Sequence, residues 1–96
     1  MSEKAAFLEK AQAHVEVWQA DVEKLRAKAA VAAADARPKI EGEIKHLETR
    51  IAEGKAKLAE VARVSEDAWG PMKEGMQSAW ESLRAGFEEA LEKLEK

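Results

Sequence analysis

The sequence predicts an all-α fold, in which long antiparallel amphipathic helices form a coiled-coil hairpin or a slim three-helix bundle. The first observation is composition: 36% of the residues are charged, 46% are hydrophobic and only 5% are aromatic, which is typical of long helices. The second is periodicity. Apolar residues recur in steps of three and four, and no stretch shows the two-residue alternation of a strand.

The first predicted helix covers residues 3–36. Its repeat is seven residues from Val15 to Ala36, as in a left-handed coiled coil. An Ala-rich run closes the segment and has high helix propensity. The apolar side of this helix comprises Phe7, Ala11, Val15, Trp18, Val22, Leu25, Ala29, Ala32 and Ala36.

The second predicted helix covers residues 38–64 and begins at a proline. Pro38 either kinks one continuous helix or marks a tight corner near residues 36–38, and the pattern supports both readings. In a corner, Asp35 is the expected N-cap. Gly54 falls on the apolar side, where a small residue lets a neighbouring helix approach. That side comprises Ile40, Ile44, Leu47, Ile51, Gly54, Leu58 and Val61.

The third predicted helix covers residues 71–96 and follows a turn near residues 65–71. Gly70 is expected to end the preceding helix and Pro71 to occupy the first position of the next. Residues 37–64 carry seven basic and five acidic groups, whereas residues 65–96 carry four and eight. This asymmetry favours an antiparallel pair across the turn, although exposed ion pairs add little stability.

Seven side chains are the expected anchors of the core or of an interaction surface. Trp69 is expected to lock the turn beside it, with a docking surface as the alternative. His14 is expected at the edge of the seam, where its titration would make the assembly mildly sensitive to acid. The seven anchors are Trp18, Leu25, Leu47, Trp69, Trp80, Leu83 and Phe87.

Composition and motifs argue against several classes of function. The chain has no cysteine, and its net charge of −3 argues against a nucleic-acid partner. No signal sequence is visible, and no apolar run approaches the ~20 residues of a membrane span. Phosphate loops and nucleophile elbows are also absent. We therefore expect a cytoplasmic protein that is not an enzyme and needs no cofactor.

One pair of residues resembles part of a metal site. Glu43 and His46 have the Glu-x-x-His spacing that carboxylate bundles use to hold iron or manganese. A complete site needs a second such motif, which a symmetric dimer would supply, with Glu16 or Glu23 as further ligands. The apolar side places Glu43 and His46 at its edge, so a solvated flank is the favoured reading.

The C-terminal third carries a Trp-centred pattern. It is formed by Ala68-Trp69, Lys73, Gly75, Ala79-Trp80, Leu83, Arg84, Phe87 and Ala90. This pattern resembles the tail of a family of small bacterial coiled-coil proteins often labelled stress-response proteins. The resemblance implies an all-helical fold, a bacterial cytosolic setting and no enzymatic activity. Relatives carry acidic residues in place of Gly70-Pro71 and a helix former in place of Pro38.

Three functions are compatible with this pattern. The favoured one is a non-enzymatic structural or interaction protein that self-associates, most simply as a dimer, in a stress-related role. The alternative is an amphipathic protein that coats a lipid or polyester surface, as phasin-like proteins do, through residues 72–96. The third is a metal-binding bundle built on Glu43 and His46.

Overall fold

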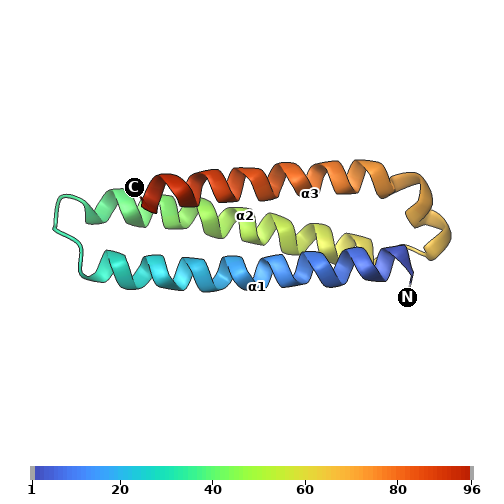
Figure 1. The fold of residues 1–96 in the computed structure, drawn as a ribbon, viewed down its shortest axis with the longest axis horizontal. Helices are drawn as coiled ribbons and strands as arrows, with labels where there is room; N and C mark the ends of the chain where they lie inside the picture. Colours follow the sequence, from blue (N-terminus) through green and yellow to red (C-terminus); the bar gives the residue numbers. More distant parts are fainter. Residues whose placement is uncertain (1, 96) are drawn as a thin grey trace.

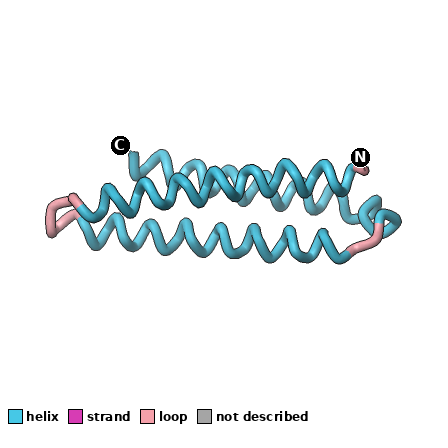
Figure 2. The backbone as a smooth tube through the Cα atoms, turned by 90° about the horizontal axis from the view of Figure 1, so that it is seen from below, coloured by secondary structure: helices cyan, strands magenta, loops and turns pink. Residues whose placement is uncertain are grey.

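Three helices run up, down and up through the molecule (Figure 1). The computed structural model describes residues 2–95, and within that range it contains α1 (Glu3–Ala30), α2 (Arg37–Arg63), α3 (Glu66–Glu95) and no strand. The bundle measures 53 × 18 × 18 Å. The loops lie at opposite ends, so α2 is antiparallel to both α1 and α3 (Figure 2). The predicted all-α fold is confirmed, in its three-helix form.

The apolar sides of the three helices face one another. Leu47, Val61 and Phe87 are the largest side chains that are fully enclosed. The predicted anchors Trp18, Leu25 and Leu83 are also buried. In α3, Trp80 is buried and its neighbour Ala79 is half-buried. The bundle therefore covers its own apolar surface within one chain, a burial that is the main source of stability.

The first corner lies earlier than the sequence analysis expected. α1 ends at Ala30, so residues 31–36 form a connection instead of the last helical turns. Arg37 stabilises this connection by donating from Nε to the Ala29 carbonyl and from Nη2 to the Ala32 carbonyl, both at 3.2 Å. The first bond adds to the one that the Ala29 carbonyl, in the last turn of α1, accepts from the Ala32 amide, and the second holds the connection itself. The corner reading of Pro38 is the one observed, rather than a kinked continuous helix.

The N-terminus of α2 differs from its predicted form. Ala36 occupies the N-cap position and makes no side-chain cap, so the expected capping role of Asp35 is wrong. Pro38 lies in the first turn of α2, where its missing N–H costs no helical hydrogen bond.

The second corner is shorter than predicted. α3 starts at Glu66, and the Ser65 hydroxyl accepts a hydrogen bond from the Ala68 amide at 3.1 Å, as an N-cap serine does. Gly70 and Pro71 therefore lie inside α3, and the predicted helix end at Gly70 is wrong. The first turns of α3 bend away from its remaining axis (Figure 1), as expected where Pro71 removes a backbone donor.

The three interfaces are not equally close. α1 and α2 approach each other most closely, and α1 and α3 approach least closely. Small residues such as Ala11 and Ala29 lie on α1, whereas the face of α3 carries Trp80 and Phe87. The large rings hold α1 and α3 apart, because a well-packed core must accommodate their full volume.

Two glycines of α2 and α3 make room for neighbouring side chains. A Cβ atom at Gly54 would lie 3.2 Å from Leu83 Cδ2 and 3.4 Å from the Trp80 ring. The predicted close approach at Gly54 therefore exists, and it admits Trp80 and Leu83. A Cβ atom at Gly86 would lie 2.8 Å from the Arg50 guanidinium, so this glycine leaves room for the arginine side chain.

We predict that Gly54→Val destabilises the bundle by about 1–3 kcal/mol more than Gly42→Val, because added volume in a packed core forces neighbours to shift. Gly42 is the matched control: it lies in the same helix, and nothing lies within 4 Å of a Cβ built there. The free energy of unfolding measured in urea compares the two variants. Equal losses would show that Gly54 does not set the distance between α2 and α3.

Candidate functional site

The interface between α1 and α3 is built from aromatic rings. We define the aromatic seam as Phe7, His14, Trp18, Trp69, Trp80 and Phe87. Trp18 stacks on Trp80 with ring centroids 5.4 Å apart, and on Phe87 with centroids 4.9 Å apart. Phe7 meets Trp80 edge-on at 6.1 Å. Offset-stacked and edge-on pairs add stabilisation beyond their buried area, so the seam is a continuous row of mutually supporting rings.

His14 joins the seam through a hydrogen bond as well as through stacking. Its ring lies nearly parallel to Trp18 and Trp80, at interplanar angles of 17° and 14°. Trp80 donates from Nε1 to His14 Nδ1 over 3.2 Å. Because Nδ1 accepts this bond, the proton of the neutral imidazole lies on Nε2. The hydrogen bond therefore requires an unprotonated Nδ1.

The surroundings of His14 favour its neutral form. Burial lowers the pKa of the imidazole below its ordinary value of 6.5, and the cations Arg84 and Lys10 lower it further. Glu81 and Glu88 act in the opposite direction. Both carboxylates are already engaged by Arg84, at 3.4 Å and 3.2 Å. The net result is a half-buried histidine that resists protonation.

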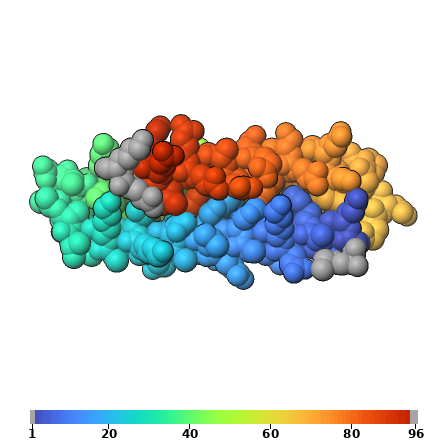
Figure 3. Space-filling view, viewed as in Figure 1, coloured from blue at the N-terminus to red at the C-terminus, as the bar shows by residue number. Residues whose placement is uncertain are grey.

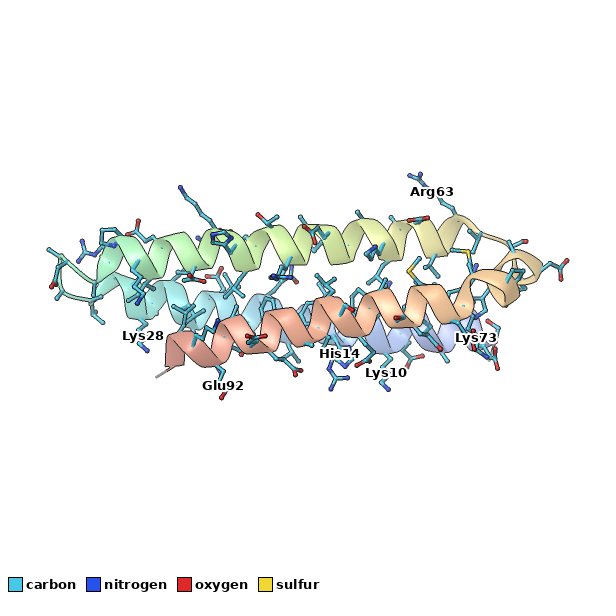
Figure 4. All side chains as sticks on the ribbon, turned by 90° about the horizontal axis from the view of Figure 1, so that it is seen from above. Lys10, His14, Lys28, Arg63, Lys73 and Glu92 are labelled. Atoms are coloured by element: carbon cyan, nitrogen blue, oxygen red, sulfur yellow. The ribbon has the colours of Figure 1, made fainter. Side chains whose placement is uncertain are left out.

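A groove of about 470 Å³ opens over this part of the seam. Figure 3 views the face on which α1 and α3 lie side by side, and Figure 4 shows Lys10, His14 and Lys73 along one edge of the bundle. Lys73 forms a 2.9 Å ion pair with Glu3 across the groove. The groove is lined by Glu3, Ala6, Phe7, Lys10, Ala11, His14, Lys73, Gln77, Trp80 and Glu81.

Trp69 closes the end of the bundle near the second corner. Its ring is buried, lies 5.2 Å from the Phe7 ring between centroids, and packs in a cluster with Val61 and Met76. Its side chain therefore packs inside the bundle end instead of presenting a docking surface. The Trp69 Nε1–H is buried and finds no acceptor among the residues described.

The predicted metal-ligand pair does not lie in a cluster of ligands. Glu43 is half-buried and His46 is exposed on α2. Within residues 2–95, no group of three or more His, Asp or Glu side chains is close enough to hold a metal ion. Glu16 and Glu23, the suggested additional ligands, are exposed on α1. Among the residues described, the pair at Glu43 and His46 gains no third ligand.

A second apolar row on α1 was missed by the sequence analysis. Val17 and Val31 are the exposed large hydrophobic residues of the described chain, with exposed fractions of 59% and 86%. Both belong to a row of exposed residues spaced by alternating steps of four and three. We call this row the outer face of α1; it comprises Ala6, Lys10, Ala13, Val17, Ala20, Lys24 and Ala27 of the helix, and Val31, which follows the last helical residue.

The signal for the outer face was present in the sequence. Alanine recurs every seven residues at positions 6, 13, 20 and 27, and seven-residue spacing is the mark of a helix seam. This repeat was overlooked because the row on the opposite side of α1 carries larger apolar residues.

We predict that Trp80→Phe destabilises the bundle by about 1 kcal/mol more than Trp69→Phe. Both changes replace an indole by a smaller ring, but only Trp80→Phe breaks a hydrogen bond and leaves a half-buried acceptor on His14. Thermal or urea unfolding of the two variants at neutral pH measures the difference. A greater loss for Trp69→Phe would contradict this assignment of the two indoles.

No protein-family model matches this chain, and neither a curated protein nor a solved structure matches it. The resemblance of its C-terminal third to bacterial coiled-coil proteins therefore stays a prediction. None of the helices is both long enough and apolar enough to cross a bilayer, within the part of the chain described. The case for a function rests on the aromatic seam and the outer face of α1.

Proposed function

We propose that this chain is a non-enzymatic interaction protein that self-associates through the outer face of α1. The aromatic seam and the rest of the core are covered within one chain, so an association between copies must use a different surface. The observation that carries the proposal is that Val17, an exposed large hydrophobic residue, lies in the middle of the outer face of α1, and that Val31, also exposed, follows at the end of the same row as the C-cap residue of the helix.

The spacing of this row suits a pair of antiparallel helices. When two copies of α1 are laid antiparallel, Val17 comes opposite Ala20 of the partner subunit, whereas Val31 lies just past the last helical residue, Ala30, at the end of the pair. Each larger side chain within the helix then faces an alanine, so the two backbones can approach closely. In the same way, Lys10 comes opposite Ala27 of the partner subunit, and Lys24 comes opposite Ala13 of the partner subunit.

Charge on this face is complementary in the same arrangement. Glu9, Glu16 and Glu23 recur every seven residues beside the row and are all exposed. Lys10 and Lys24 can lay their aliphatic stems over the facing alanines and carry their ammonium groups toward the glutamates of the other copy. Such pairs set orientation more than they add affinity.

The surface-coating alternative has less support from the geometry. The apolar side of α3 that would contact a lipid or polymer packs Met76, Trp80, Leu83 and Phe87 into the bundle. Coating would therefore require the bundle to open. A bacterial, stress-related role stays part of the proposal through the family resemblance alone.

We expect the protein to be an oligomer, most simply a dimer, whose melting temperature falls on dilution because assembly and folding are linked. Val17→Glu places a carboxylate in the middle of the interface and should give a monomer with an unchanged helical spectrum. Ala56→Glu is the matched control, since Ala56 is exposed on α2, and it should keep the mass of the wild type.

Sedimentation equilibrium over a dilution series measures these masses. A wild-type chain that is monomeric at every concentration, or a Val17→Glu variant that keeps the wild-type mass, would contradict the proposal. Helicity that increases on adding vesicles, together with a wild-type monomer, would favour surface coating instead.

A further inference from the structure

The hydrogen bond between His14 and Trp80 connects α1 to α3 inside the aromatic seam. We propose that His14 is an acid-sensitive latch, which holds α3 against α1 while the imidazole is neutral and releases it when the imidazole is protonated. The two atoms concerned are His14 Nδ1 and Trp80 Nε1, 3.2 Å apart.

Protonation changes the contact in two unfavourable ways. A protonated imidazole carries hydrogen on both nitrogens, so Nδ1 turns from an acceptor into a donor that faces another donor. The new positive charge also lies near the cations Lys10 of α1 and Arg84 of α3. The loss of the hydrogen bond and the repulsion by nearby cations therefore both oppose protonation of His14.

The carboxylates near His14 do not compensate for these unfavourable effects. Glu81 and Glu88 of α3 attract the protonated ring, but Arg84 lies within 3.4 Å of both carboxylates. The groups that act on His14 come from α1 and α3, and α2 contributes none of them. Farther along the groove, Glu3 and Lys73 are paired with each other.

The interface at which the latch acts is the least close of the three. Besides the ring contacts, α1 and α3 are joined at their ends by the Lys73–Glu3 ion pair and by Lys28 Nζ, which donates to the Leu94 carbonyl over 3.1 Å. Both links involve exposed groups, so they contribute little to holding the interface. Loss of the central contact therefore weakens α1–α3 packing before α1–α2 packing.

The direction of the pH effect follows from the lowered pKa of His14. A group whose pKa is lowered by folding binds more protons in the unfolded chain, so its contribution is complete above the ordinary value of 6.5 and is lost as pH falls through the folded-state pKa. Each unit of difference between the two pKa values changes the ratio of folded to unfolded protein by up to about tenfold.

The first test uses NMR of the full chain between about pH 7.5 and pH 5. The Trp80 Nε1–H signal should move as His14 titrates, and it should move by more than the Trp69 Nε1–H signal, which has no acceptor in the described chain and responds only through its contact with Phe7 of α1. A His14 pKa at or above the ordinary value of 6.5 would overturn the proposal, and so would a Trp80 signal that does not change as His14 titrates.

The second test compares variants in urea at the same two pH values. His14→Gln keeps an acceptor oxygen that does not titrate, so it should lose less stability on acidification than the wild type does. His46→Gln is the matched control and should follow the wild type. Identical pH dependence in His14→Gln and the wild type would overturn the latch. If His14→Gln does not fold, the NMR titration of the wild type decides alone.

The latch and self-association share one residue, Lys10, which lies on the outer face of α1 and also acts on His14, but they are tested by different measurements. The readouts of the latch are the Trp80 signal and the pH dependence of unfolding, whereas the proposed function is judged by mass on dilution. One of the two proposals can therefore fail while the other stands.

Discussion

Trp80 is the side chain at which all three helices meet, and the geometry of the bundle depends on it. Its ring stacks on Trp18 of α1 at 5.4 Å, donates to His14, and packs over Gly54 of α2, where no Cβ obstructs it. An indole needs both apolar surroundings and an acceptor when buried, and this position supplies both. The distance between α1 and α3 follows from the width of this ring and its neighbours, and so does the groove above them.

This arrangement gives the molecule an enclosed apolar interior and a surface on which the remaining large hydrophobic residues stand out. The apolar sides of the helices cover one another completely enough that Val17 and Val31 are the large hydrophobic residues left exposed within residues 2–95. In a monomeric protein, scattered exposed apolar residues need no explanation. Val17 and Val31 are a more specific feature, since they follow the same seven-residue repeat as four exposed alanines. This repeat matches the geometry of helix pairing. That distinction is why the proposed interaction is assigned to α1.

The all-α fold and the buried side of each helix were predictable from the sequence, because the three-to-four spacing of apolar residues is a property of one helix at a time. The corners were less predictable. Arg37 fixes the first corner by donating to one carbonyl of α1 and to one carbonyl of the connection, a tertiary contact that local propensity does not contain. The second corner was misplaced because Pro71 was interpreted as the start of a helix. Ser65 instead caps the helix at an earlier position, and the helix continues through Pro71 with a bend. At the candidate site, Trp80 was recognised as an anchor. Its bond to His14 was not, since nothing in the spacing of residues 14 and 80 links them.

The side of α1 that carries His14 and the outer face of α1 are held in place by different neighbouring helices. His14 and Trp18 lie against α3, whereas the closest packing of α1 is with α2. Because small residues let α1 and α2 approach closely, the position of α1 is set mainly by that pair and only secondarily by the rings of α3. The outer face of α1 is therefore held in place by the interface that does not contain His14. A change confined to the α1–α3 seam would leave the row around Val17 in its present geometry, so an acid-weakened seam and an intact association surface are physically compatible.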